Sequence, residues 1–340
     1  MKFEVIVGNP PYQLGNQSIH HLFIEKAISY KAKYICFITK NNWLTSNTLS
    51  DTRHKIIEYG LNTLINFPKL KDVFNDVNVS VCILLLHKDY KGDVRYREIE
   101  KNNTIEDTKL HYKNIVAQEK IITNQHQISI INKVKSNKDF QQFNLPKNAR
   151  LFSISSNGKF MQSTYTEDII KYLSDTEINT VNKHDLVEVV FLDSSHNRFS
   201  RFTTTDFIYR GKEYIDKYKV VCGSKVSTTD QVYSNINLLM PGQIMTNSFG
   251  IIGLMDTGFR AMALWKYAKT KFHRALVYFG LGETRITYGI GCTQYVPLQD
   301  FSVNSDIIWK NSIEDIDKQL FNKYNLSNDE IEYINKIIKY

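Results

Sequence analysis

The stretch of this sequence best suited to chemistry is Asn9-Pro10-Pro11-Tyr12. Proline fixes φ near about −65°, lacks an amide hydrogen and keeps the preceding residue out of the helical region, so two successive prolines make a rigid extended turn. Such a turn can present a side-chain amide, a free carbonyl and an aromatic ring toward one point. The Asn9 side-chain oxygen and the Pro10 carbonyl can then accept the two N–H groups of an exocyclic amine, while Tyr12 stacks on its ring.

This geometry suits the amine of adenine, which is a poor nucleophile because its lone pair is delocalised into the ring. Two acceptors on its N–H groups favour a more tetrahedral and more nucleophilic nitrogen. A base inside a duplex cannot reach such a pocket, so we expect it to be flipped out. The alternative is a proline-rich surface turn, since Asn-Pro commonly begins turns. The position of the motif directly after the apolar strand Phe3–Val7 disfavours that alternative.

An α/β layer must position the turn. The pattern predicts strands at Phe3–Val7, Tyr34–Thr39, Leu61–Phe67 and Asn78–Leu86, and helices at Ser18–Lys31 and Ser50–Tyr59. Strands that alternate with helices indicate an α/β fold, and such sheets bind ligands at the carboxyl ends of their strands. The polar stretch Tyr96–Gln127 predicts an extended connection with short elements.

The second half of the chain is less periodic. We expect strands at Asp185–Leu192, Tyr218–Cys222 and Ile251–Met255 and a helix over Phe259–Leu281. Ser312 with Asp315, and Ser327 with Glu330, have the spacing of a capping box, which predicts terminal helices at about 313–323 and 328–338.

Composition narrows the class of protein. The 340 residues carry a formal net charge of +8, which favours an anionic partner such as nucleic acid, although a merely basic surface gives the same charge. The apolar run Val81–Leu86 is far shorter than the ~18 residues of a membrane span, and the start lacks a signal peptide. The four cysteines are scattered without a CxxC pair. We therefore expect a cytoplasmic protein with no membrane association, disulfide framework or metal site.

Phe3–Gln13 resembles the catalytic motif of gamma-type adenine-N6 DNA methyltransferases, as found in type II (IIG-like) restriction–modification systems. Further stretches are similar to the later catalytic strands and to the target-recognition half of such enzymes, namely Tyr34–Leu44, Asp72–His87, Ile244–Phe249, Lys269–Phe272, Tyr295–Phe301 and Ile316–Ser327. The resemblance implies that S-adenosyl-L-methionine is the methyl donor and double-stranded DNA the partner. It also implies catalytic roles for Asn9, Pro10, Pro11 and Tyr12, and Asn in the first position favours adenine over cytosine.

The same resemblance implies a fold. We expect a partial Rossmann-like methyltransferase sheet over residues 1–130, followed by a mixed α/β target-recognition domain with C-terminal helices over residues 131–340. Some family members stack a second aromatic residue on the base. The strand Val79–His87 has no aromatic residue at its end, so we do not expect that contact there.

The family's cofactor-binding half normally precedes the catalytic loop, which here begins at residue 9. The glycine pair Gly280 and Gly282 does not replace that half, because two capped helices rather than further α/β units are predicted after it. Without that half, Phe3–Val7 becomes an exposed apolar sheet edge. We therefore expect a partner subunit to carry the cofactor-binding half, with a truncated and inactive remnant as the competing hypothesis.

Basic residues interleaved with aromatic residues provide candidate DNA contacts. For each of them a solvated surface position is the alternative, and together they are predicted to line a DNA cleft. The set is His196, Asn197, Arg198, Arg201, Arg210, Lys219, Lys225, Arg285 and Gln294. His20 and His21 are interpreted as surface or core histidines, because they point in different directions on a helix and have no Cys or Asp partner nearby.

Two other functions remain open at this stage. The first is a DNA-binding specificity subunit that recognises a sequence without catalysis. The second is an RNA or protein-glutamine methyltransferase, which shares the Asn-Pro-Pro-Tyr loop but is disfavoured by the large basic second half.

Overall fold

The computed structural model describes residues 3–15, 17–68, 80–100, 103–112, 115, 120–146, 151–152, 172–192, 198–223, 232, 236–246, 248–281 and 292–339. The chain forms two compact units. The first comprises Met1–Ile128 with Gly282–Thr284, and the second Ser129–Leu281 with Arg285–Tyr340. No helix in these ranges is both long and apolar enough to cross a membrane.

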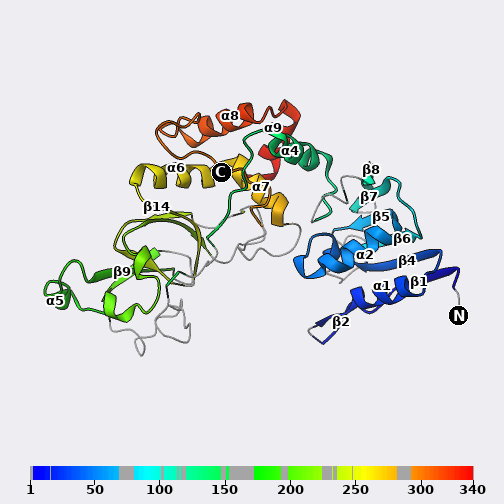
Figure 1. Cartoon of the computed structure of the whole chain (residues 1–340), viewed down its shortest axis with the longest axis horizontal. Coiled ribbons are helices and arrows are strands. Elements are labelled where there is room, and N and C mark those ends of the chain that lie inside the picture. The colour runs from blue at the N-terminus through cyan, green and yellow to red at the C-terminus, as the bar shows by residue number, and fades with distance from the viewer. Residues whose placement is uncertain are drawn as a thin grey trace. The chain divides into compact units, whose positions relative to one another are not determined.

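A six-stranded sheet organises the first unit, in the order β1-β4-β6-β5-β7-β8 (Figure 1). Its strands are β1 (Val5–Gly8), β4 (Tyr34–Lys40), β6 (Val81–His87), β5 (Leu61–Phe67), β7 (Val94–Glu100) and β8 (Asn103–Leu110). β1 runs parallel to β4 and β5 parallel to β7, whereas the β4–β6, β5–β6 and β7–β8 pairs are antiparallel. The predicted α/β fold is confirmed as a sheet of mixed strand orientation, in which β1 is an outermost strand.

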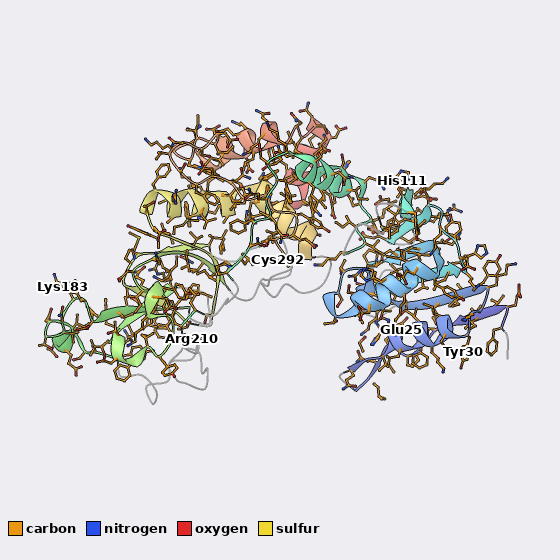
Figure 2. All side chains as sticks on the ribbon, in the orientation of Figure 1. Glu25, Tyr30, His111, Lys183, Arg210 and Cys292 are labelled. Carbon is orange, nitrogen blue, oxygen red and sulfur yellow. The ribbon has the colours of Figure 1, made fainter. Side chains whose placement is uncertain are left out.

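Two helices pack beside the strands that they connect. α1 (His20–Ser29) joins β1 to β4, and α2 (Ser50–Gly60) follows β4 after the short 3₁₀ helices η1 (Asn41–Leu44) and η2 (Asn47–Leu49). Ile24 and Ala27 of α1 are buried at three-residue spacing, as in an amphipathic helix. Glu25, labelled in Figure 2, links the helices because its Oε1 accepts a 2.6 Å hydrogen bond from Thr52 of α2.

The structure of Tyr96–Gln127 differs from the extended connection with short elements that the sequence predicted. Most of its first half belongs to the antiparallel pair β7–β8, which extends the sheet beyond β5. Alternating charged residues such as Arg95, Arg97 and Asp107 hide this pairing, because the pair's outward side chains are polar and leave a weak apolar signal. α4 (Gln125–Ser136) begins near the end of the stretch.

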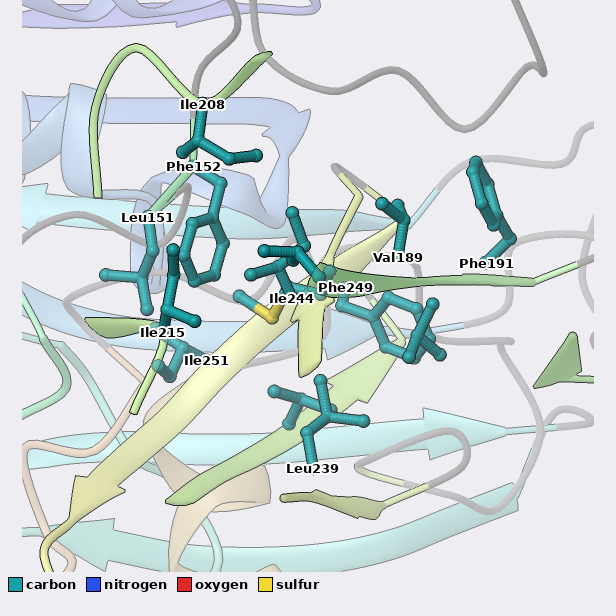
Figure 3. Packing of buried hydrophobic residues seen from close by; sticks show 14 residues of the cluster. Leu151, Phe152, Val189, Phe191, Ile208, Ile215, Leu239, Ile244, Phe249 and Ile251 are labelled. Carbon is teal, nitrogen blue, oxygen red and sulfur yellow. The ribbon is translucent and has the colours of Figure 1, made fainter. Parts of the chain in front are cut away.

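Two three-stranded sheets organise the second unit, in the orders β10-β9-β13 and β12-β11-β14. The strands are β9 (Leu186–Leu192), β10 (Arg198–Thr204), β11 (Tyr218–Gly223), β12 (Asn237–Leu239), β13 (Gln243–Met245) and β14 (Phe249–Met255). Side chains from both sheets, including Val189, Phe191, Ile244 and Ile251, form one buried apolar cluster (Figure 3). The predicted strands at Asp185–Leu192, Tyr218–Cys222 and Ile251–Met255 are confirmed as parts of β9, β11 and β14.

Helices complete the second unit. Among the described residues they are the larger part of α4, from Ser129 onward, and the short α5 (Asp175–Ile178), α6 (Gly258–Lys269), α7 (Lys271–Leu281), α8 (Ile313–Lys323) and α9 (Asn328–Ile337). Ser312 and Ser327 cap α8 and α9 as predicted, since their side chains accept from the backbone N–H of Asp315 and Glu330. The single helix expected over Phe259–Leu281 is in fact broken at Thr270, whose hydroxyl donates to the Tyr267 carbonyl and accepts from the His273 N–H.

Candidate active site

Asn9, Pro10, Pro11 and Tyr12 follow β1 directly, at the carboxyl end of a parallel strand. The last residue of the strand, Gly8, lies against Phe37 of β4, and a Cβ added to it would come within 3.3 Å of the Phe37 ring. Pro10 is buried, whereas Asn9 is exposed. Glycine thus lets β1 pack closely on β4 up to the turn, while Pro10 fixes the turn and leaves the Asn9 amide accessible.

The far end of this loop is tied to the beginning of α1. The backbone N–H of Ile19 donates to the Tyr12 carbonyl at 3.1 Å. Between them lies the small hairpin of β2 (Gln13–Leu14) and β3 (Gln17–Ser18). Lys40 Nζ, at the end of β4, donates to Gln13 Oε1 at 3.1 Å. The loop is therefore held at both ends by the strands and helix of the first unit.

His20 strengthens this attachment from inside the unit. Its side chain is fully buried, and Nδ1 lies 2.7 Å from Oγ1 of Thr39 in β4. Burial lowers the pKa of His20 to about 4, with the nearby His21 acting in the same direction and the Asn42 side chain opposing it. The imidazole is therefore neutral near neutral pH. His20 is a core residue, in line with one of the two interpretations from sequence, and no cluster of three His, Cys, Asp or Glu side chains in the described ranges could hold a metal.

A buried polar layer follows β4 at the same end of the sheet. Asn41 Nδ2 donates to Asn66 Oδ1 of β5 at 3.0 Å, and Trp43 Nε1 donates to the Cys82 sulfur of β6 at 3.3 Å. The Arg53 guanidinium of α2, itself buried, donates to the Trp43 carbonyl at 2.7 Å. We did not predict these supporting residues, although Asn41 and Trp43 follow a strand's carboxyl end, the same signal that identified the Asn9 loop.

Tyr12 is half-buried beside this layer. Burial raises the pKa of its phenol, and the nearby Cys82 thiol contributes in the same direction. Tyr12 is therefore a neutral phenol within electrostatic reach of Cys82, near the start of β6.

The direction of β6 determines which end of this strand lies beside the Asn9 loop, where a second stacking residue would be needed. β6 is antiparallel to β4, with Lys40 opposite Val81 and Tyr34 opposite His87. The start of β6 therefore lies at the same end of the sheet as the Asn9 loop, and His87 lies at the other end. The position predicted for a second aromatic residue, at the end of this strand, therefore lies away from the Asn9 loop. Residues 69–79, which precede β6, lie outside the described ranges.

The predicted DNA contacts fall into four groups: exposed, half-buried, buried, and outside the described residues. Arg198 and Arg201 on β10 and Arg210 are exposed, and Figure 2 shows Arg210 on the second unit. Gln294 is half-buried. The remaining predicted contacts except Lys219 lie outside the described residues, namely His196, Asn197, Lys225 and Arg285.

The structure contradicts the prediction that Lys219 contacts DNA. Its side chain is fully buried in β11, and its Nζ donates to the carbonyls of Ile215 at 2.9 Å and Lys217 at 2.7 Å. Burial lowers the pKa of this ammonium to about 7. An ammonium enclosed in this way cannot meet a phosphate, so Lys219 does not belong to the predicted DNA surface. Lys219 lies in a strand whose residues 219–223 are all buried, so its charge alone misled the prediction.

The first unit is thus an α/β sheet with an Asn-Pro-Pro-Tyr loop at the carboxyl end of a parallel strand. Residues 1–74, which include this loop, match the family model of the Eco57I restriction-modification methylase. The predicted resemblance to this family is therefore confirmed.

Individual proteins and solved structures are also similar to parts of this chain. An uncharacterized adenine-specific methylase of Mycoplasma pneumoniae is 34% identical over 106 residues, which cover 27% of this chain and 25% of that protein. Among solved structures, the type IIL restriction-modification enzyme MmeI in complex with DNA matches with a TM-score of 0.50 and 12% identity, over 98% of this chain and 56% of that one. The type IIG restriction endonuclease BpuSI gives a TM-score of 0.39 at 10% identity, over 96% and 49%. The chain thus spans a quarter of the curated relative and about half of these solved chains.

Proposed function

We propose that this chain is the catalytic-loop and DNA-recognition component of a site-specific DNA adenine-N6 methyltransferase in a restriction–modification system. The observation that carries the proposal is the Asn9–Tyr12 loop, fixed at the carboxyl end of β1 within the region that matches the methylase family. The exposed Asn9 amide and the anchored Tyr12 leave acceptors and an aromatic ring close together, as recognition of an amine-bearing base requires.

In the proposed reaction, a flipped adenine stacks on Tyr12 and places its N6 amine against the loop. Asn9 Oδ1 and the Pro10 carbonyl accept its two N–H groups and direct the nitrogen lone pair toward the methyl group. S-adenosyl-L-methionine supplies that methyl group as an electrophile. The N–C bond forms as the C–S bond breaks, S-adenosylhomocysteine leaves, and the proton released from nitrogen passes to water. No covalent bond to the protein is formed.

The described residues do not make a complete cofactor site. The turn after β1 holds two prolines and the turn after β4 holds Asn41, Asn42 and Trp43, and neither pairs glycines with a ribose-binding carboxylate. In this proposal a partner subunit carries the cofactor-binding half. Adenine recognition by Asn9 and Tyr12 does not depend on which polypeptide carries the methyl donor.

DNA contact is assigned chiefly to the second unit. Exposed Arg198 and Arg201 on β10, with Arg210, provide guanidinium groups that bind phosphates or guanine edges. His196, Asn197, Lys225, Arg285 and Gln294 remain candidates from the sequence. The net charge of +8 favours association with an anionic duplex.

The test is transfer of a labelled methyl group from S-adenosyl-L-methionine to duplex DNA, followed by identification of the modified base. The chain is assayed alone and with the product of the adjoining upstream gene, provided that gene encodes a glycine-rich cofactor half. We expect N6-methyladenine only with both polypeptides. Sequence-specific DNA binding without transfer in either case would replace the proposal with the alternative of a catalytically inactive specificity subunit or remnant.

A further inference from the structure

A cavity of about 720 Å³ lies in the first unit, over the starts of β5 and β7 and the end of β8, which are neighbouring strands (Figure 1). Thr63 pairs with Arg95 and Arg95 with Lys109, so these three side chains share one face of the sheet. Leu64 and Tyr96, the next residues along β5 and β7, point to the opposite face and are fully buried. The cavity is therefore formed on the exposed side of this part of the sheet, and its volume is that of a small-molecule site.

The two carboxylates that line the cavity have hydrogen-bond donors outside it. Oδ2 of Asp93 lies 3.0 Å from Nδ1 of His111, which Figure 2 labels on the first unit, and Oδ1 accepts the backbone N–H of Tyr112 at 3.3 Å. Oδ2 of Asp107 accepts a 2.8 Å hydrogen bond from Nε of Arg97. These three donor residues do not line the cavity. Both carboxylates are therefore satisfied without a ligand.

The donors that line the cavity are less completely paired than its carboxylates. Nη2 of Arg95 has a 3.6 Å contact with Oδ2 of Asp107, an atom that already accepts a shorter hydrogen bond. Lys109 is exposed and, among the residues that the structure describes, makes no ion pair. Oδ1 of Asn62 accepts from the Thr63 hydroxyl at 2.9 Å, which leaves the Asn62 NH₂ group as a donor. The cavity thus offers spare donors, two of them cationic, and this favours an anionic ligand.

An aromatic ring, that of Tyr90, also lines the cavity. It stacks on His87 with ring centroids 6.2 Å apart, and His87 stacks on Tyr34 with centroids 4.7 Å apart. The Tyr90 hydroxyl donates to the Asp93 carbonyl at 2.7 Å, and Gly92 makes room for it, since a Cβ there would come within 2.5 Å of the hydroxyl oxygen. The ring is therefore held in place before a ligand arrives, which reduces the entropic cost of stacking a planar group on it.

The cavity lies apart from the Asn9 loop. β4, β6 and β5 separate β1 from β7 in the sheet, and four strand spacings amount to about 19 Å. Strand pairing places Gly8, which precedes Asn9, level with Tyr96 of β7, whereas the cavity lies toward the start of that strand. A small ligand in the cavity therefore does not reach the loop, so it is neither the methyl donor nor the target base of the proposed reaction.

We propose that this cavity is a separate binding site for a nucleoside phosphate. Arg95 and Lys109 bind the phosphate group, because a guanidinium offers paired N–H donors and an ammonium adds a compact charge. The base stacks on Tyr90, and the NH₂ group of Asn62 donates to an acceptor of the ligand. Inorganic phosphate uses the two cations and leaves the aromatic ring without a partner, so the combination favours the nucleoside form. The site is independent of the proposed methyl transfer.

Equilibrium dialysis of the full chain against radiolabelled ATP measures this binding directly. We expect one ATP per chain with a Kd below about 1 mM. Arg95→Met and Lys109→Met, both at exposed positions, should each weaken binding at least about tenfold, since each removes a charged contact. Lys26→Met removes the same charge from an exposed position of α1 and should leave the Kd unchanged. Absence of ATP binding, or equal effects of the three variants, overturns the proposal.

Further measurements test the class of ligand and its place. Tyr90→Leu should weaken ATP binding about tenfold through lost stacking, whereas Tyr90→Phe should retain it. Inorganic phosphate should displace ATP only at a concentration at least about tenfold higher, and displacement at equal concentrations contradicts the nucleoside assignment. Asn9→Ala should leave ATP binding unchanged, because loss of binding in this variant would place the nucleotide at the Asn9 loop. Displacement of ATP by a duplex oligonucleotide would make the DNA backbone the occupant and would equally overturn the proposal.

Discussion

The His20–Thr39 contact predicts that the first unit loses stability in mild acid. His20 is fully buried with a pKa near 4, against an ordinary histidine value of 6.5. As the pH falls below 6.5, the unfolded chain binds a proton on this imidazole and the folded chain does not, so the free energy of unfolding decreases. One pKa unit corresponds to about 1.4 kcal/mol, so we expect a loss of about 2 kcal/mol from His20 between pH 6.5 and about pH 5.

The substitution that tests this expectation is His20→Asn. It keeps a polar group near the position of Nδ1 and removes the imidazole that titrates. The variant should lack this part of the acid sensitivity, whereas His54→Asn, at an exposed position of α2, should retain it. Urea unfolding at several pH values measures the difference. Trp43 is the tryptophan of the first unit and is fully buried, so its fluorescence isolates this unit once Trp265 and Trp309 are replaced by Phe.

A second measurement examines the contact itself. In a double-mutant cycle with Thr39→Val and His20→Asn, we expect a coupling energy of about 0.5–1.5 kcal/mol, the usual net value of a neutral hydrogen bond. The same acid loss in His20→Asn and in the unmodified chain would refute the assignment of His20 as a buried neutral anchor of the loop.

Three further outcomes follow from individual contacts. Arg53→Met removes the Arg53 donor from the Trp43 carbonyl and leaves the Ser46 carbonyl with the Leu49 N–H alone. It should cost about 2–4 kcal/mol in urea unfolding, part of which Arg53→Lys restores. Burial, and secondly Glu98, raise the pKa of Glu106 to about 7, so stability should fall as the pH rises from about 4.5 through 7. Glu106→Gln should abolish this decrease, which amounts to about 1–2 kcal/mol after allowance for partial exposure, as thermal unfolding across that pH range would reveal. Arg201→Ala should weaken binding to any duplex and lower the salt dependence by about one phosphate contact in fluorescence titrations, whereas Lys219→Met, a substitution at a buried position, should change neither.

Local patterns predicted the elements that surround the loop. Apolar runs predicted β1, β4, β5 and β6 near their observed bounds. The serines at 312 and 327 marked the starts of the terminal helices because a capping side chain acts within one turn. The Asn9 loop was identifiable for the same reason, since proline acts on its own backbone and its immediate neighbours.

Features that depend on distant contacts were not predictable from these patterns. The break at Thr270 lies in a continuous helical pattern, and it coincides with Asp317, which accepts the N–H groups of Lys271 and Phe272 from 45 or more residues away. From its charge, Lys219 is predicted to be a DNA contact at the surface, and only the carbonyls around its ammonium reveal its burial. Likewise, the β7–β8 pair takes its place in the sheet from pairing with β5, which its charged sequence does not indicate.

The central claim is that the Asn9 side chain activates the target amine. The most direct test is the rate of methyl transfer to duplex DNA by the reconstituted pair of polypeptides, with Asn9→Ala compared to the unmodified chain. Loss of one preorganised polar contact in a transition state typically costs about 10²–10³ in kcat, and we predict a loss in this range with complex formation unchanged. Transfer at an undiminished rate by the Asn9→Ala pair would contradict the account.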